Sequence, residues 1–285
     1  LSGKKGIVFG VANDRSIAWG ITQALSQAGA RIALTYQGDR LKERVESLAA
    51  TLDGALTLPC DATDDDQIAQ VFQSLKEEFG DISFLVHSIA FANKEDLEGR
   101  FADTSRDGFR LALEVSSYSL LPLVRHAAPL MTDGGSVVAM TFDASQKVYP
   151  GYNVMGTAKA ALENEVRQLA SDLGRDNIRV NAISPGLTET AGLNDLFGGG
   201  EQGAALAVHI ADPELPCRRL VQQQEEWEWN PNLAGQQGLL QQRIRQQVLD
   251  RGFLGGRHEK HLAIQVGCRL VVHPSSQVTV QAGNF

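Results

Sequence analysis

Tyr152 and Lys159 are the two side chains of this sequence whose types and spacing suggest a reaction. Seven residues make about two turns of a helix, so both side chains are expected on one helix face. A lysine there can bind a ribose and hold positive charge near the tyrosine, which favours phenolate character. The tyrosine hydroxyl can then stabilise a developing oxyanion. Taken alone, such a pair is usually part of the surface, so its meaning depends on the surrounding fold.

A second candidate site lies where an apolar strand runs into Gly10. A helix that opens directly after a glycine turn points backbone N–H groups and its positive dipole end at a pyrophosphate. Ser16 can donate its hydroxyl or cap the helix that starts at Ile17, and Gly20 would let this helix approach the sheet. The segment is not the common Gly-x-Gly-x-x-Gly, so an ordinary capped strand–turn–helix stays an alternative.

The ends of the next three strands supply the rest of this candidate nucleotide site. The second strand ends at Gln37 rather than at the acidic residue that usually binds the ribose, and its amide can bind the ribose or cover the adenine. Arg40 and Lys42 could instead meet a 2′-phosphate, so NADH is favoured and NADPH is possible. Asp61, followed by Ala62, is expected to face the adenine or to cap a turn. Small residues after the fourth strand allow close approach of the cofactor: Ser88, Ile89 and Ala90.

Alternating strand and helix patterns place these residues. Apolar strands are expected at 6–9, 31–36, 55–60, 84–87, 136–140 and 178–183. Helices are expected at 17–28, 39–52, 64–79, 109–131 and 153–173. Continuous apolar strands between helices indicate a doubly wound parallel α/β sheet of the Rossmann type, covered on both faces, with ligands at the carboxyl ends of its strands. One such domain is expected over residues 1–285.

The pattern weakens after about residue 190. Residues 191–255 are expected to form an atypical substrate loop or insertion, because three consecutive glycines at 198–200 and a Gln-rich stretch resist regular structure. A helix over His261–Val272 and a short strand over Gln277–Gln281 are predicted to follow.

The composition excludes several classes of partner. The formal net charge is −8, whereas nucleic-acid binding needs a basic face, and no apolar run is long enough to span a membrane. The first residues lack the apolar core of a signal peptide, so a cytoplasmic protein is expected. The cysteines (Cys60, Cys217, Cys268) form no Cys-x-x-Cys pair, and no metal site is expected.

Taken together, these motifs resemble the short-chain dehydrogenase/reductase superfamily and, within it, the enoyl-acyl-carrier-protein reductases. Typical members of the superfamily carry Tyr-x3-Lys, whereas Tyr152 and Lys159 have the Tyr-x6-Lys spacing of the enoyl reductase branch. Further segments that look like this branch are Gly10–Gly20, Tyr36-Gln37, Cys60-Asp61, Val86–Ala90 and Tyr152–Gly156.

This resemblance implies that NADH reduces the 2,3 double bond of a trans-2-enoyl thioester, carried by acyl carrier protein or coenzyme A, in fatty-acid synthesis. Tyr152 and a cofactor ribose hydroxyl would stabilise the enolate, and Lys159 would hold the ribose. Backbone groups near Thr188 would meet the nicotinamide carboxamide, and Thr190 a phosphate. The resemblance also implies a homo-oligomer, a tetramer. The residues expected around the acyl group are Phe91, Ala92, Phe142, Tyr152 and Met155.

Departures from the family pattern leave two alternatives open. Phe142 stands where many members have a second tyrosine, so any proton relay through that hydroxyl is lost and an apolar pocket wall is expected; mycobacterial-type enoyl reductases share Phe-Asp-x-Ser here. Pro185, where the branch more often has alanine, permits a 3-ketoacyl (carbonyl) reductase, although Met155 in place of a tyrosine argues against it. The unusual residues after 190 permit a non-catalytic dinucleotide-binding protein with an incomplete acyl pocket.

Overall fold

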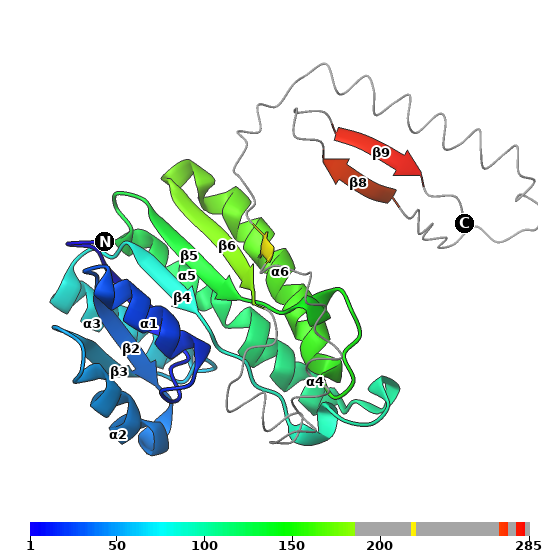
Figure 1. The fold of residues 1–285 in the computed structure, drawn as a ribbon, viewed down its shortest axis with the longest axis horizontal. Coiled ribbons are helices and arrows are strands. Elements are labelled where there is room, and N and C mark those ends of the chain that lie inside the picture. Colours follow the sequence, from blue (N-terminus) through cyan, green and yellow to red (C-terminus); the bar gives the residue numbers. More distant parts are fainter. Residues whose placement is uncertain (186–217, 221–267, 273–277, 283–285) are drawn as a thin grey trace, which may run out of the picture. The chain divides into compact units, whose positions relative to one another are not determined.

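The computed structural model describes residues 1–185, 218–220, 268–272 and 278–282 (Figure 1). The chain divides into two compact units, Leu1–Glu225 and Glu226–Phe285. In the second unit, β8 (Cys268–Val272) pairs with β9 (Val278–Ala282) in antiparallel fashion.

These two strands decide two of the predictions for the end of the chain. The strand predicted over Gln277–Gln281 is confirmed by β9. The helix predicted over His261–Val272 is wrong for its last five residues, which form β8. Val271 and Val272 are β-branched and favour extended backbone, and the helical spacing of apolar residues hid this preference.

The first unit contains a seven-stranded sheet with the order β3-β2-β1-β4-β5-β6-β7. Its strands are β1 (Lys5–Phe9), β2 (Arg31–Tyr36), β3 (Leu56–Pro59), β4 (Phe84–His87), β5 (Gly135–Met140), β6 (Ile178–Ser184) and β7 (Arg218–Leu220). Neighbours from β3 to β6 pair in parallel, and β7 runs antiparallel to β6. The strand order reverses between β1 and β4, and such a switch point is where ligands bind in doubly wound folds. The predicted fold class is confirmed.

Helices cover both faces of this sheet, as its apolar strands require. They are α1 (Ile17–Gln27), α2 (Gly38–Ala49), α3 (Asp65–Phe79), α4 (Arg106–Leu113), α5 (Leu120–Ala127) and α6 (Asn153–Leu173). Neighbouring residues of a strand point to opposite faces. Val8 of β1 therefore packs with α1 and α2, whereas Ile7 and Phe9 pack with α3, α5 and α6.

The helix predicted over 109–131 is interrupted. A π-helix, Glu114–Tyr118, separates α4 from α5, and a 3-10 turn, Ala128–Leu130, ends the run. Pro129 lies in that final turn, where its missing N–H and its ring stop the α-helix. The π-helix is important for the site because its serines contact neighbouring elements.

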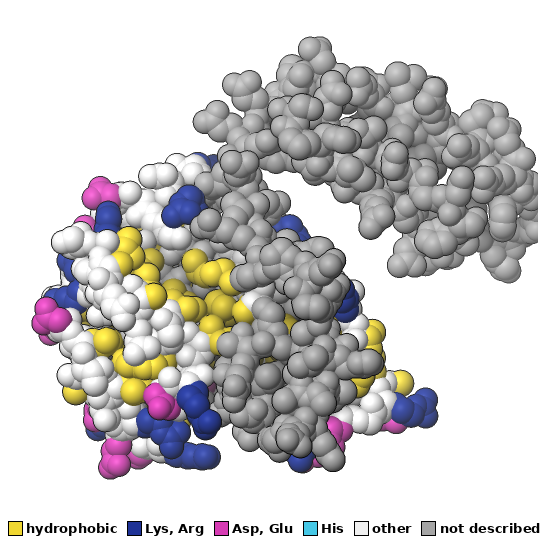
Figure 2. All heavy atoms as spheres, in the orientation of Figure 1, with side chains coloured by type: hydrophobic (Ala, Val, Ile, Leu, Met, Phe, Trp, Pro, Cys, Tyr) yellow, Lys and Arg dark blue, Asp and Glu magenta, His cyan; other side chains and the backbone are white. Residues whose placement is uncertain are grey.

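Figure 2 shows hydrophobic side chains gathered near the centre of the face turned towards the viewer. Within the described ranges, no helix is both long and apolar enough to cross a membrane.

Candidate active site

At the switch point, Gly10 follows β1 and Ser88 follows β4, and these two residues lie in close contact. The φ of Gly10 is 97°, and a Cβ atom there would lie 2.0 Å from the carbonyl oxygen of Ser88. No other residue type can take this backbone conformation at this separation without a shift of the chain. The two residues predicted to contact the cofactor are thus brought together, as their register (Phe9 opposite His87) requires.

Ser16 caps the helix that follows this turn. Its hydroxyl accepts a hydrogen bond from the Trp19 amide (3.3 Å) and donates one to the carbonyl oxygen of Asn13 (2.7 Å). Helix α1 therefore begins at Ile17, as predicted, with its positive dipole end directed at the turn. The role predicted for Gly20 is wrong, because Gly20 is exposed and no atom lies near a Cβ built on it.

Gln37 and Asp61 meet across the carboxyl ends of β2 and β3. The Gln37 amide Nε2 donates to Asp61 Oδ2 at 2.9 Å. The other carboxylate oxygen accepts from the amide and the hydroxyl of Thr63, at 2.9 and 2.7 Å, so Asp61 also caps the turn that contains Ala62. The bond to Asp61 fixes the orientation of the Gln37 amide, which the sequence alone does not determine.

The residues at these four strand ends fit a dinucleotide. The glycine at position 10 leaves room for a close approach, and the start of α1 offers N–H groups to a pyrophosphate. Gln37 and Asp61 provide polar atoms at the β2–β3 end of the cradle. At the β4 end, Ser88 and Ile89 are half-buried and Ala90 is exposed.

The predicted catalytic pair belongs to α6. Tyr152 is the N-cap residue of this helix, and Lys159 lies in its second turn. Lys159 is 5% exposed, and its Nζ donates to the carbonyl oxygen of Met140, the last residue of β5, at 2.8 Å. Burial lowers the pKa of Lys159 to about 8, although the carboxylate of Glu163 acts in the opposite direction.

Burial affects the protonation of the Tyr152 hydroxyl. It raises the pKa of Tyr152, which favours the neutral hydroxyl over the phenolate. This effect acts against the phenolate character expected from sequence. A neutral hydroxyl can still stabilise an oxyanion, because it donates its proton in a hydrogen bond.

Apolar residues surround the Tyr152 ring. Phe142 contacts it edge-on, with the ring centroids 5.1 Å apart. Ala92 and Met155 belong to the same apolar cluster as Tyr152. Four of the five residues predicted to contact the acyl group are thus brought together, and the fifth, Phe91, is half-exposed at 52%.

Ser116 of the π-helix holds the backbone at Phe91. Its hydroxyl accepts from the Phe91 amide at 2.9 Å and donates to the Phe91 carbonyl oxygen at 3.1 Å. This clamp fixes the chain where it leaves Ala90 and enters the apolar cluster at Ala92. Ser116 was not predicted from the sequence, because a serine within a helical pattern carries no sign of a π-helix.

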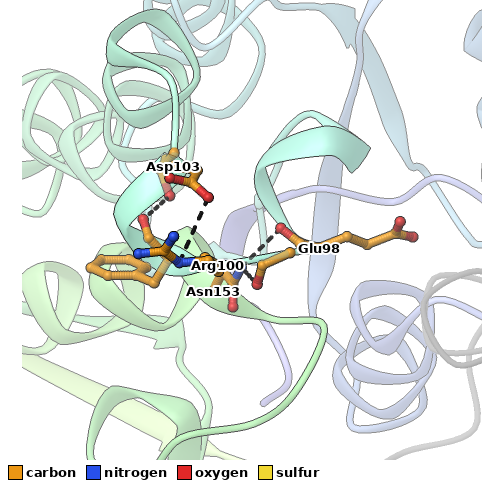
Figure 3. Close-up of polar contacts among 7 residues, drawn as sticks. Glu98, Arg100, Asp103 and Asn153 are labelled. Atoms are coloured by element: carbon orange, nitrogen blue, oxygen red, sulfur yellow. Dashed lines mark hydrogen bonds and ion pairs between the residues drawn. The ribbon is translucent and has the colours of Figure 1, made fainter.

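Asn153 ties a surface loop to the start of α6 (Figure 3). Its side-chain nitrogen donates to the carbonyl oxygens of Glu98 (3.1 Å) and Gly99 (3.2 Å). The loop continues into a 3-10 turn, within which Arg100 and Asp103 form an exposed ion pair of 3.9 Å. A cavity of about 480 Å³ opens nearby, between this loop, the start of α6 and residues 144–149; Tyr152, Asn153 and Phe101 are among its lining residues.

Part of the predicted site lies outside the described residues. This part comprises Thr188, Thr190 and the insertion predicted at 191–255, apart from β7 (Arg218–Leu220).

The chain matches a family of known proteins over most of its length. The family model described as enoyl-(acyl carrier protein) reductase matches residues 10–226. An enoyl-[acyl-carrier-protein] reductase [NADH] of Bacillus subtilis is 53% identical over 192 residues, which cover 67% of this chain and 74% of the relative. One from Rhizobium meliloti is 53% identical over 190 residues, which cover 67% and 70%.

Solved structures of similar proteins agree with these matches. The Bacillus cereus enoyl-acyl carrier protein reductase, in complex with NADP⁺ and indole naphthyridinone, superposes with a TM-score of 0.71 at 47% identity, covering 77% of this chain and 84% of that one. The enoyl-[acyl-carrier-protein] reductase (NADH) of Aquifex aeolicus gives a TM-score of 0.68 at 41% identity, covering 73% and 80%.

Proposed function

The chain belongs to the enoyl-(acyl carrier protein) reductase family and is an NADH-dependent reductase of the enoyl double bond in fatty-acid synthesis, and we propose that Tyr152 and Lys159 are its catalytic pair. The observation that supports the pair is their placement. Tyr152 lies among apolar side chains, and the buried Lys159 ammonium lies at the carboxyl end of β5. The family match decides against a 3-ketoacyl reductase and against a non-catalytic protein.

Each residue of the site has its own proposed role in the reduction. NADH, when bound, supplies the hydride that adds to C3 of the enoyl thioester, and the enolate that forms takes up a proton from water at C2. Tyr152 donates a hydrogen bond to the thioester carbonyl oxygen, which stabilises the negative charge that develops there. Lys159 binds the ribose hydroxyls and adds positive charge near this oxygen. Phe142, Ala92 and Met155 exclude water, so these interactions act in a medium of low dielectric constant.

The cradle is proposed to hold the cofactor as follows. Gly10 and the start of α1 would hold the pyrophosphate, and Gln37 and Asp61 would bind the adenosine. The backbone from Ser88 to Ala90 would contact the nicotinamide half, and the backbone near Thr188, with Thr190, would provide further contacts. NADPH is a second possibility, because Arg40 and Lys42 are exposed on α2.

Five finer points are also proposed. Acyl carrier protein, rather than coenzyme A, carries the thioester, as the names of the relatives state for those proteins. A homo-oligomer, a tetramer by resemblance, and a cytoplasmic location stay predictions. So do the single domain over 1–285 and the substrate insertion at 191–255.

The test follows NADH oxidation by the full chain with crotonyl and longer 2-enoyl thioesters, beside Tyr152→Phe and a 3-ketoacyl substrate. We expect turnover of the enoyl substrates and its loss in Tyr152→Phe, with NADH still bound. Turnover of the 3-ketoacyl substrate alone would overturn the proposal in favour of a carbonyl reductase. NADH binding without turnover of either substrate would indicate a non-catalytic protein.

A further inference from the structure

The buried carboxylate of Glu163, on α6, joins both ends of a turn. Glu163 is 6% exposed, and its Oε1 atom accepts from the hydroxyls of Thr141 (2.8 Å) and Ser145 (2.5 Å). A buried carboxylate is costly unless it is hydrogen-bonded, and bonds to a charged acceptor are stronger than neutral ones. Thr141 lies two residues before the 3-10 turn Asp143–Ser145 and Ser145 is its last residue, so the carboxylate holds this turn against α6.

Contacts of Asp143 with Tyr149 and Lys147 also hold the turn in place. Asp143 accepts from the Tyr149 hydroxyl at 3.1 Å and pairs with the Lys147 ammonium at 2.8 Å. At its base, the Ala144 carbonyl oxygen lies against Gly156 of α6, where a Cβ atom would be only 2.8 Å away. The turn therefore has little room to move relative to the helix.

The position of this turn determines the position of Phe142, which lies between Thr141 and the turn. The Phe142 ring packs between two tyrosine rings, with its centroid 4.9 Å from that of Tyr149 and 5.1 Å from that of Tyr152. A displacement of the turn would move Phe142 and remove the support of the Tyr152 ring.

Glu163 also lies one helical turn after Lys159 (i, i+4), so the two side chains are neighbours on α6. Its negative charge favours the ammonium form of Lys159, against the effect of burial. On β4, the other titratable group that interacts with Lys159 is His87, whose pKa burial lowers to about 3, so it is neutral near pH 7.

We propose that Glu163 is a positioning residue for both members of the catalytic pair: it supports the Tyr152 ring through Thr141, Ser145 and Phe142, and its carboxylate is the neighbour of Lys159 one helical turn along α6. Glu163 contacts neither substrate nor reacting atoms in this proposal, which rests on the roles proposed for Tyr152 and Lys159.

Three variants separate the two effects. Glu163→Gln keeps the shape and removes the charge, whereas Ser145→Ala and Thr141→Val each remove one hydroxyl and keep the charge. The matched control is Glu165→Gln. Glu165 lies on the same helix and accepts from the Ser117 hydroxyl at 2.8 Å, but it does not contact the turn within the described structure.

In full-length protein confirmed as folded, we expect Glu163→Gln to lower kcat about tenfold, with KM for NADH changed less than about twofold. The alkaline limb of its kcat/KM profile should move to lower pH, because Lys159 loses its stabilising neighbour. Ser145→Ala and Thr141→Val should lower kcat several-fold without moving this limb. Wild-type kcat and an unmoved limb in Glu163→Gln, or an equal loss in Glu165→Gln, would overturn the proposal.

A second readout needs no turnover. With 3-fluorotyrosine placed at position 152, Ser145→Ala and Thr141→Val, which each remove one hydroxyl that donates to Glu163, should shift the ¹⁹F resonance, and Glu165→Gln should not. Unshifted resonances in Ser145→Ala and Thr141→Val would contradict the support of the Tyr152 ring, whatever the activity. If the wild-type chain fails to reduce enoyl thioesters while the resonance still shifts, the proposed function fails and the positioning of the ring stands.

Discussion

The ammonium of Lys159 donates a 2.8 Å hydrogen bond to the carbonyl oxygen of Met140, which joins the second turn of α6 to the end of β5. A lysine ammonium has three donors, so this bond leaves others to bind ribose hydroxyls. The bond also directs the side chain along the sheet rather than into solvent. This bond fixes the position of the Lys159 ammonium, and in the proposed mechanism its charge state controls activity.

The pKa of Lys159, about 8, predicts an alkaline limit to activity. Above this pH Lys159 loses its proton, and with it the positive charge that we propose binds the ribose and stabilises the oxyanion. We expect kcat/KM for NADH, which reports on the free enzyme, to fall about tenfold per pH unit above pH 8.

Deprotonation of Lys159 does not itself destabilise the fold, as the sign of the linkage shows. The pKa of Lys159 is lower in the folded state than its ordinary 10.5, so between pH 8 and 10.5 the unfolded chain binds more protons and this residue makes the fold more stable as the pH rises. Lys159→Arg stays charged and should be weakly active without this limb. A wild-type profile that stays flat well above pH 8 would show that the ammonium is not required.

Gly10 and Gly20 offer a matched pair of substitutions. In Gly10→Ala the new Cβ would lie 2.0 Å from the Ser88 carbonyl oxygen at a φ of 97°, so the turn must shift. We expect a loss of about 1–3 kcal/mol in the free energy of unfolding and much weaker NADH binding, measured by denaturation and by fluorescence titration.

Gly20→Ala, ten residues away, meets no such contact. Gly20 is exposed within α1, and alanine is the better helix former, so this variant should be about 0.5–1 kcal/mol more stable and bind NADH normally. Equal behaviour of the two variants would show that the close contact at Gly10 is not what shapes the nucleotide site.

The sequence predicts what depends on periodicity and on local turns. The parallel sheet, the bounds of α6 and the cap at Ser16 follow from apolar spacing and from residue types that favour one local conformation. Gly10 could be predicted in the same way, because the turn before this helix needs a positive φ, which glycine adopts readily. The resemblance of the Tyr-x6-Lys segment then added the chemistry.

Contacts between distant elements were not predictable in this way. The bond between Gln37 and Asp61 depends on the separation of two strand ends, and the Phe91–Ser116 clamp depends on a π-helix that has no sequence signature. Glu163 could have been noticed, because a carboxylate one turn after Lys159 on a buried face needs a partner. The neutral state of Tyr152 depends on burial, which the sequence does not give.

His87 is predicted to destabilise the protein in acid. It is fully buried on β4, and its Nε2 lies 2.8 Å from the Ser119 hydroxyl. That hydroxyl donates its one proton to the Val115 carbonyl oxygen, so Nε2 must carry the proton of a neutral imidazole. Burial and, secondarily, the charge of Lys159 lower the pKa of His87 from 6.5 to about 3.

Between pH 6.5 and 3 the unfolded chain therefore binds a proton that the folded chain does not, and stability is lost as the pH falls. The contribution approaches about 1.4 kcal/mol per pH unit below pH 6. Urea denaturation at several pH values would measure it. His87→Gln cannot titrate, so its stability should fall less steeply with acid; parallel curves would contradict the role assigned to His87.

Asn153 is predicted to support the substrate side of the site. Its two hydrogen bonds hold the loop at Glu98 and Gly99 against the start of α6, next to Tyr152 (Figure 3). Loss of both should raise KM for the enoyl thioester about fivefold in Asn153→Ala, at about 0.5 kcal/mol each, while the dissociation constant of NADH stays unchanged. Asn153→Asp also lacks the donors and should behave alike.

Arg100→Ala is the control for this loop. Arg100 and Asp103 lie on the same segment, but their side chains are 81% and 68% exposed and their charges are 3.9 Å apart. Such surface pairs contribute little, so steady-state kinetics should not distinguish Arg100→Ala from wild type. A rise in KM in Arg100→Ala equal to that in Asn153→Ala would mean that the whole loop, and not its attachment to α6, contacts the substrate.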